Sequence, residues 1–157
     1  MKVLVILSSA LFLTGCFDSD APEKELAKVP VEESVQAEQS SLGENAELKK
    51  STNLGQSVFD KNCIACHGKI GEGLVKDWKE RDADGKFPAP PINGTAHAWH
   101  HSPKALLATI NNGGVKLGGW MPGFKDKLSE DEKQGLLDYV HSLWPNELQQ
   151  KYDARFK

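Results

Sequence analysis

Two cysteines and a histidine stand together in the segment Cys63-Ile64-Ala65-Cys66-His67. A helical turn over this C-x-x-C-H spacing sets the two thiols at the right distance to add across the two vinyl groups of a porphyrin, and the adjoining imidazole then lies beneath the iron as an axial ligand. The motif therefore predicts one covalently attached haem c. It constrains the fold strongly, because the chain must surround this cofactor.

Two other interpretations of the motif compete with haem attachment. A thioredoxin-like C-x-x-C pair needs a βαβ context, and none is visible in the sequence. A zinc site needs two further ligands, which His97, His100 or His101 could supply. Signs of export at the N-terminus, described below, favour haem, because haem is attached outside the cytoplasm, where a free C-x-x-C pair risks oxidation.

Met121 is the candidate for the second axial ligand, since it is the only methionine after the initiator. It lies in the glycine-rich segment 118–124, whose glycines allow the backbone to approach a porphyrin closely, and Pro122 limits local flexibility. His/Met ligation is the usual arrangement in cytochromes c, whereas a methionine that only fills a core gap is the alternative. The competing ligands are the histidines His97, His100, His101 and His141, of which His141 is expected to be a surface or packing residue.

Composition limits the remaining classes of protein. The chain has 157 residues and three cysteines, an odd number that cannot all pair within one chain. A mean hydropathy of −0.47 excludes a protein with many membrane spans. A net charge of −3 and a pI near 5.9 give no support for nucleic-acid binding.

The N-terminus reads as an export signal. Lys2 precedes the mostly apolar run Val3–Leu13, which is too short to span a membrane but suits a signal peptide. Residues 13–16 resemble a bacterial lipoprotein box, which implies a signal peptide over 1–15 and a lipid on Cys16. By the same resemblance, Phe17 in the position after the cysteine favours sorting of the protein to the outer membrane. The alternative is an ordinary signal peptide with an incidental cysteine.

Residues 16–52 are expected to be a lipidated N-terminus and flexible tether. From 17 to 52 there are nine Asp/Glu against four Lys, a net charge of −5, and little apolar periodicity. Such a segment buries too little apolar surface to offset its ordering entropy. A weaker alternative is a transient helix over Glu32–Leu48, where good helix formers gather. Residues 53–157, with 14 Lys/Arg and 13 Asp/Glu, form the expected folded domain.

The folded domain is predicted to be all-α, because no segment alternates like a strand or hairpin. A helix over Leu54–Asn62 leads into the haem motif, and Trp78–Pro91, rich in Asp, Gly and Pro, is predicted as a loop. Two later helices are expected, one beginning at Ser102-Pro103 and stopped by Gly113, the other from Ser129 to Pro145. Their apolar faces comprise Leu106, Leu107 and Ile110, and Leu136, Leu137, Val140, Leu143 and Trp144.

Residues 54–145 resemble a class I cytochrome c, a small fold of three to five helices around one haem. The pattern Gly55-x-x-x-Phe59-x-x-x-Cys63 matches the first helix of that family. The resemblance implies that Gly55 permits close crossing by the last helix, whose aromatic residue matches Tyr139.

The same resemblance assigns roles around the haem. The segment 89–92 resembles the proline loop of the family, which implies that the Pro90 carbonyl accepts the Nδ1–H of His67. Trp99 or His100 is a hypothetical hydrogen-bond donor to a haem propionate.

His67 and Met121 as axial ligands would leave no open position for a substrate, so a one-electron Fe(III)/Fe(II) carrier is expected and not an enzyme. The expected protein is a monomer, lipid-anchored in the cell envelope with the haem domain facing the periplasm. Its expected partners are redox proteins: a quinol-oxidising complex, a dehydrogenase, or a terminal oxidase or reductase. The alternatives are a haem-based gas sensor, in which Met121 leaves the iron, and an accessory haem subunit of an envelope oxidoreductase.

Overall fold

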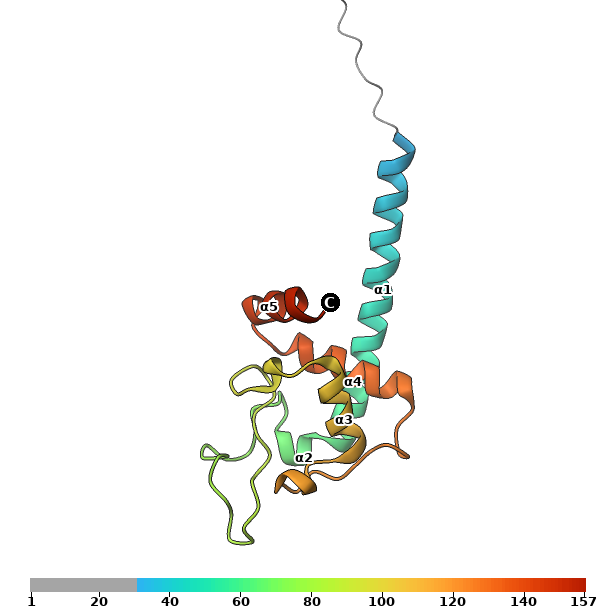
Figure 1. Ribbon diagram of the computed structural model, residues 1–157. Helices are drawn as coiled ribbons and strands as arrows, with labels where there is room; N and C mark the ends of the chain where they lie inside the picture. The colour runs from blue at the N-terminus through green and yellow to red at the C-terminus, as the bar shows by residue number, and fades with distance from the viewer. Residues whose placement is uncertain (1–30) are drawn as a thin grey trace, which may run out of the picture.

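The computed structural model describes residues 31–157, and within them the fold is helical, with no strand. The predicted signal peptide over 1–15 and the predicted lipidation at Cys16 lie outside the described residues. The elements in chain order are α1 (Val31–Asn62), α2 (Ile64–His67), η1 (Ala98–His100), α3 (Pro103–Asn112), η2 (Val115–Leu117), α4 (Glu130–Ser142) and α5 (Asn146–Phe156), as Figure 1 shows.

The two predicted helix starts are confirmed by their caps. The side chain of Ser102 accepts a hydrogen bond from the Ala105 amide, and Pro103 occupies the first turn of α3. At the start of α4, Ser129 and Glu132 form a reciprocal capping box. These local contacts explain why the sequence located both helix starts correctly.

The end of the predicted last helix needs correction. The sequence predicted a helix up to Pro145, but α4 ends at Ser142, and a further helix, α5, follows. Trp144 lies in the connection between them, where it is 3% exposed and donates its indole N–H to the Ile92 carbonyl at 2.8 Å. Pro145 therefore starts α5 as its N-cap.

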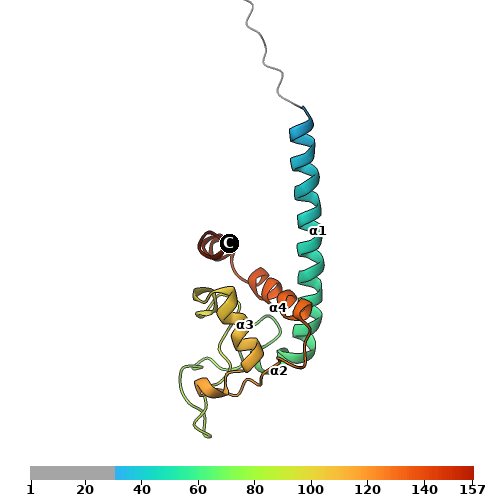
Figure 2. The same ribbon diagram turned by 45° about the vertical axis from the view of Figure 1, so that its right-hand side comes forward.

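The first helix is longer than predicted. Residues 31–52 were expected to be flexible, but α1 already begins at Val31 and extends well beyond the helices that it contacts (Figure 1, Figure 2). Residues 43–50 are all exposed, so tertiary packing does not explain this extension. Their glutamates, lysines, alanine and leucine are good helix formers, and the packed part of α1 supplies the nucleus from which the helix propagates.

α1 and α4 cross at Gly55, as the family resemblance implied, and at a second glycine, Gly135, which the resemblance did not identify. A Cβ atom at Gly55 would overlap the carbonyl of Gly135, and one at Gly135 would lie 2.8 Å from the Ser51 carbonyl oxygen. The backbones therefore touch directly. Ser51 adds a side-chain hydrogen bond to Asp138 at 2.5 Å beside the crossing.

The core lies on one side of this crossing. Val58 and Phe59 of α1 pack against Leu136 and Tyr139 of α4, and the Phe59 and Tyr139 rings are 5.2 Å apart. Phe59 is fully buried, whereas Leu54, earlier on the same helix, is 37% exposed. The core thus holds the end of α1 in place, and the C-x-x-C-H segment follows it directly.

Candidate functional site

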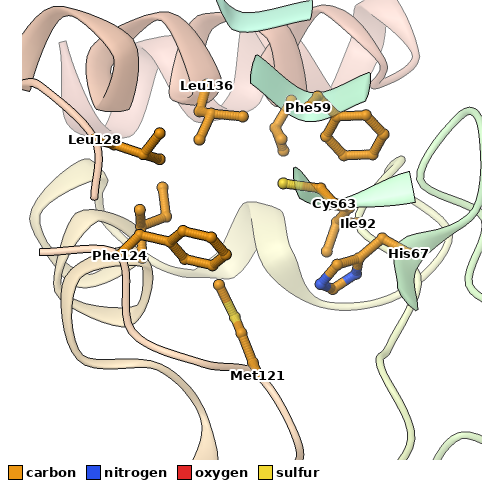
Figure 3. Close-up of a pocket in the computed structure, with 10 residues that line it drawn as sticks. Phe59, Cys63, His67, Ile92, Met121, Phe124, Leu128 and Leu136 are labelled. Atoms are coloured by element: carbon orange, nitrogen blue, oxygen red, sulfur yellow. The ribbon is translucent and has the colours of Figure 1, made fainter. Parts of the chain in front are cut away.

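A pocket opens between α1, α2, α3, α4 and the loop that carries Met121. In Figure 3 the imidazole of His67 and the side chain of Met121 extend into this pocket from two different segments. It holds about 410 Å³ of space, part of it open to solvent. The lining comprises Phe59, Cys63, His67, Ile92, Ile110, Met121, Phe124, Leu128, Leu136 and Val140.

The His67 ring is oriented by the proline loop. Its Nδ1 atom lies 3.1 Å from the carbonyl oxygen of Pro90, the contact predicted from the family resemblance. A carbonyl only accepts, so Nδ1 carries the hydrogen and Nε2 keeps its lone pair for a metal. Burial lowers the pKa of the imidazole, and the bond to Pro90 opposes that shift. The ring is therefore held in the neutral form that binds metals.

The two cysteines of the motif differ in environment. Cys63 lines the pocket and is half-buried, whereas Cys66 is exposed. Burial, with a smaller contribution from Cys66, raises the pKa of the Cys63 thiol to about 11. Cys63 is the N-cap of the short helix α2 and Cys66 lies within that helix, so one helical turn presents the two thiols and His67 from the same segment.

The residues of the pocket fit haem c. An imidazole nitrogen and a thioether sulfur extend into one apolar space, and Cys63, one of the two cysteines predicted to form the covalent links, lines it. These are the donor types that hold haem in His/Met cytochromes. The remaining lining residues are hydrophobic, which suits a porphyrin. The roles of Cys63, Cys66, His67, Met121 and Pro90 toward haem remain predictions.

The histidines at 97, 100 and 101 lie outside the pocket. His97 stacks on Trp78 and contacts the edge of His101. Within residues 31–157, no group of three or more His, Cys, Asp or Glu side chains is arranged to hold a metal ion. The zinc alternative therefore has no assembled ligand set in this part of the chain.

The hypothetical role of Trp99 at a propionate also meets an obstacle. Its indole N–H already donates to the Ala96 carbonyl at 2.9 Å, and its ring stacks on His100 at 3.7 Å. The indole N–H of Trp99 is thus already used in a local hydrogen bond and is not available to a propionate. His141, by contrast, packs as predicted: it lies against Trp144 and Tyr152.

Sequence reasoning missed part of the lining. Leu128 lies in an irregular segment before α4, and Phe124 follows the Met121 loop, so neither belongs to a periodic apolar face. The available signal was their hydrophobicity, since Phe124 and Leu128 stand on either side of the charged run Lys125-Asp126-Lys127. Phe124 is 8% exposed, which marks it as core.

Comparisons with known proteins identify the family of this chain. Residues 50–140 match the family described as cytochrome C oxidase, cbb3-type, subunit III. The chain is 32% identical over 89 residues to the cbb3-type cytochrome c oxidase subunit CcoP of Azospirillum sp. (strain B510), which is 57% of this chain and 27% of that protein. It is 31% identical over 125 residues to CcoP of Rhodobacter capsulatus, covering 75% of this chain and 37% of that protein.

A smaller relative is covered almost completely. The chain is 32% identical over 94 residues to cytochrome c6 of Chlorolobion braunii, which is 56% of this chain and 85% of that protein. By contrast, the chain spans only about a quarter to just over a third of the two oxidase subunits. The match at 50–140 includes every predicted haem-binding residue and the α1–α4 crossing. The chain therefore belongs to the cytochrome C oxidase, cbb3-type, subunit III family and is a c-type cytochrome with an all-α fold.

Proposed function

We propose that this protein is a membrane-anchored, mono-haem electron carrier of the cell envelope with His67 and Met121 as the axial ligands. The observation that carries the proposal is the approach of these two side chains into one apolar pocket from separate segments. Haem c, when bound, supplies one-electron cycling between Fe(III) and Fe(II).

The protein's own residues define what the site can do. His67 and Met121 would fill both axial positions, which leaves no place for a substrate at the metal. Cys63 and Cys66 would hold the group by thioether links, so it cannot be lost during turnover. The apolar lining, with Phe59 at its back, excludes water from the buried part of the pocket. A rigid, dry site suits electron transfer, since little rearranges when the charge changes.

The proposal of one haem rests on the cysteine count. The sequence contains three cysteines, and only Cys63 and Cys66 have the C-x-x-C-H spacing. Cys16 stands far from any histidine in the sequence and is the proposed lipid site.

Substitution of Met121 tests the ligand assignment. The oxidised protein is expected to show the weak absorption band of an Fe–S(Met) bond near the red edge of the visible, and Met121→Ala should abolish it. The reduction potential should fall by on the order of 0.1 V, because a thioether favours Fe(II). Leu117→Ala is the matched control, since Leu117 directly precedes the segment that carries Met121 and is 72% exposed. An unchanged band and potential in Met121→Ala would overturn the assignment.

The gas-sensor alternative predicts a different result from the same protein. It requires that Met121 leaves the iron readily and that CO binds rapidly to the reduced wild-type protein without denaturant. Slow CO binding in the wild type, and fast binding in Met121→Ala, would support the carrier.

The names of the relatives favour a second candidate function. CcoP is named as a subunit of a cbb3-type cytochrome c oxidase, so this chain could serve as a haem subunit of a terminal oxidase as well as a mobile donor to one. Purification of the tagged full-length chain in mild detergent separates the two. A mobile carrier is expected to elute as a monomer, whereas a subunit would bring stoichiometric partner chains with it.

The anchor is proposed from the N-terminal sequence. None of the helices within residues 31–157 has the length and hydrophobicity that crossing a bilayer requires. Lipid on Cys16 would hold the chain at the membrane without a spanning helix. Phe17, the residue after the cysteine, favours sorting of the lipoprotein to the outer membrane. The haem domain would then face the periplasm.

A further inference from the structure

The inner side of the Met121 loop is tied to the end of α3. The Gly114 amide donates to the Met121 carbonyl at 2.9 Å, and the Phe124 amide donates to the Ile110 carbonyl at 2.9 Å. These bonds fix the backbone on both sides of Met121. They do not explain what holds the outer side of the loop, which faces away from α3.

The outer side is held by a turn distant in sequence, residues 81–87, here called the Asp82 strap. The Phe87 amide donates to the Gly118 carbonyl at 2.8 Å, and Phe87 forms an isolated parallel bridge with Gly119. The Trp120 indole N–H donates to Oδ2 of Asp82 at 2.6 Å, although 38 residues separate them. Contact is thus made at three successive residues immediately before Met121.

The strap is itself a rigid turn built around one carboxylate. Oδ1 of Asp82 accepts hydrogen bonds from the amides of Asp84 at 3.0 Å and Lys86 at 2.8 Å. The Asp82 amide donates to the Lys86 carbonyl at 2.8 Å, and the Arg81 guanidinium donates to the Gly85 carbonyl at 2.7 Å. Oδ1 therefore organises the turn, which leaves Oδ2 free to reach the indole.

The strap lies directly on the loop. Gly118 adopts φ +86°, and a Cβ atom there would lie 3.3 Å from the Arg81 guanidinium and 3.5 Å from the Phe87 ring. The Arg81 guanidinium also covers the Phe87 ring at 4.1 Å. The indole of Trp120 and the Lys86 amide lower the pKa of the Asp82 carboxyl, so the acceptor is ionised at neutral pH and the bond is charge-assisted.

We propose that Asp82 is a positioning residue for the Met121 ligand and acts through Trp120. Trp120 is bonded to Met121 in the chain, so fixing its indole limits the swing of the loop and keeps the thioether directed into the pocket. The inference rests on the proposed function, in which Met121 binds the iron. It assigns a purpose to residues 81–87, which the sequence identified only as part of a loop.

Displacement of Met121 by imidazole in the oxidised holoprotein tests the proposal. Trp120→Phe keeps an aromatic ring but removes the indole N–H donor. Asp82→Asn leaves a single acceptor oxygen, which cannot accept from both the turn amides and the indole. Each is expected to speed the loss of the Fe–S(Met) band roughly five- to tenfold, the size expected for one exposed charge-assisted bond. Hydrogen exchange at the Phe87 amide should also accelerate, because the strap then detaches from Gly118.

Asp84→Asn is the matched control, since it makes the same charge change within the same turn while its amide donates as before. It should stay within about twofold of the wild type, because no bond to the loop is lost. If Asp82→Asn and Trp120→Phe behave like Asp84→Asn while Met121→Ala abolishes the band, the strap proposal is overturned and the ligand assignment stands. If the wild type has no such band and Met121→Ala changes nothing, the proposed function fails and the strap proposal fails with it.

Discussion

Gly55 and Gly135 set the distance between the two helices that frame the pocket. Each faces the backbone of the other helix, and no side chain fits between them. Because Phe59 follows one turn after Gly55 on α1 and Cys63 comes directly after that helix, the crossing also determines where the pocket wall and the first thiol lie. Adding one methyl group at this crossing should therefore also shift the helices that line the pocket.

Gly55→Ala is expected to destabilise the holoprotein by about 2–3 kcal/mol, because the new Cβ would force the helices apart. Gly43→Ala is the matched control in the same helix, since no atom lies within 4 Å of its Cβ position. It should be neutral or stabilising by up to about 1 kcal/mol, since alanine favours a helix over glycine. Urea unfolding followed by circular dichroism measures both, and equal effects would refute the role of the crossing.

The burial of Lys133 cannot be predicted from its residue type or its local sequence. The residue is only 2% exposed, and its ammonium donates to the Lys125 carbonyl at 3.0 Å and to Glu130 at 2.8 Å. A lysine on a helix is normally read as solvent-exposed. Its burial depends on the segment after Met121 folding back over α4, which the local sequence does not encode.

At the scale of elements, α5 is attached by aromatic side chains. Tyr152 packs with its ring 4.8 Å from Trp144 and 4.8 Å from Phe156, and it is 5% exposed. Trp144 in turn donates its indole N–H to the carbonyl of Ile92, the last residue of the proline loop. The helix thus supports, through Trp144, the loop that orients His67. It lies beyond residues 50–140, the part of the chain that matches the family.

Tyr152 should make stability depend on alkaline pH. Burial and then the nearby Asp153 raise the pKa of its hydroxyl above the usual value of about 10. The folded state therefore keeps a proton that the unfolded state releases, so this stability is complete below about pH 10 and is lost as pH rises further. Tyr152→Phe keeps the ring but has no proton to release.

Urea unfolding at pH 9 and at pH 11 checks this expectation. The wild type should lose more stability between the two values than Tyr152→Phe does. Tyr139, whose pKa is also raised by burial, contributes equally to both proteins. A larger loss in the Tyr152→Phe variant would contradict the assignment.

Helix α1 has a part that is packed in the core and a part that is exposed to solvent. Its C-terminal part is buried against α4, whereas residues 43–50 are exposed on all sides. The prediction of a tether recognised correctly that this segment lacks an apolar face. The weaker alternative, a helix over Glu32–Leu48, is the one that the structure shows, because a nucleus further along the same helix lets good helix formers continue it.

At the scale of the whole molecule, a helical haem domain is joined through α1 to an N-terminus proposed to carry lipid. The N-terminal part of α1 extends away from α2 and α3 (Figure 1), so this part of the helix does not cover the pocket that redox partners are proposed to approach. The short encounters typical of such partners need only small interfaces.

Cys16→Ser tests the anchor in the intact protein. Metabolic labelling with a fatty acid should mark the wild-type chain and be lost in the variant, which should also leave the membrane fraction. Haem content should be unchanged, because Cys63 and Cys66 are intact. Labelling that persists in Cys16→Ser would rule out this cysteine as the lipid site.

The sequence by itself determined the cofactor chemistry, the two helix caps at Ser102 and Ser129, and the class of fold. It could do so because thiol spacing, capping side chains and apolar periodicity act over a few neighbouring residues. Only the tertiary structure decided that Lys133 is buried, that Trp144 joins α5 to the proline loop, and that Asp82 reaches Trp120. These contacts join segments 8 to 52 residues apart, and they form only once the chain has folded around the pocket.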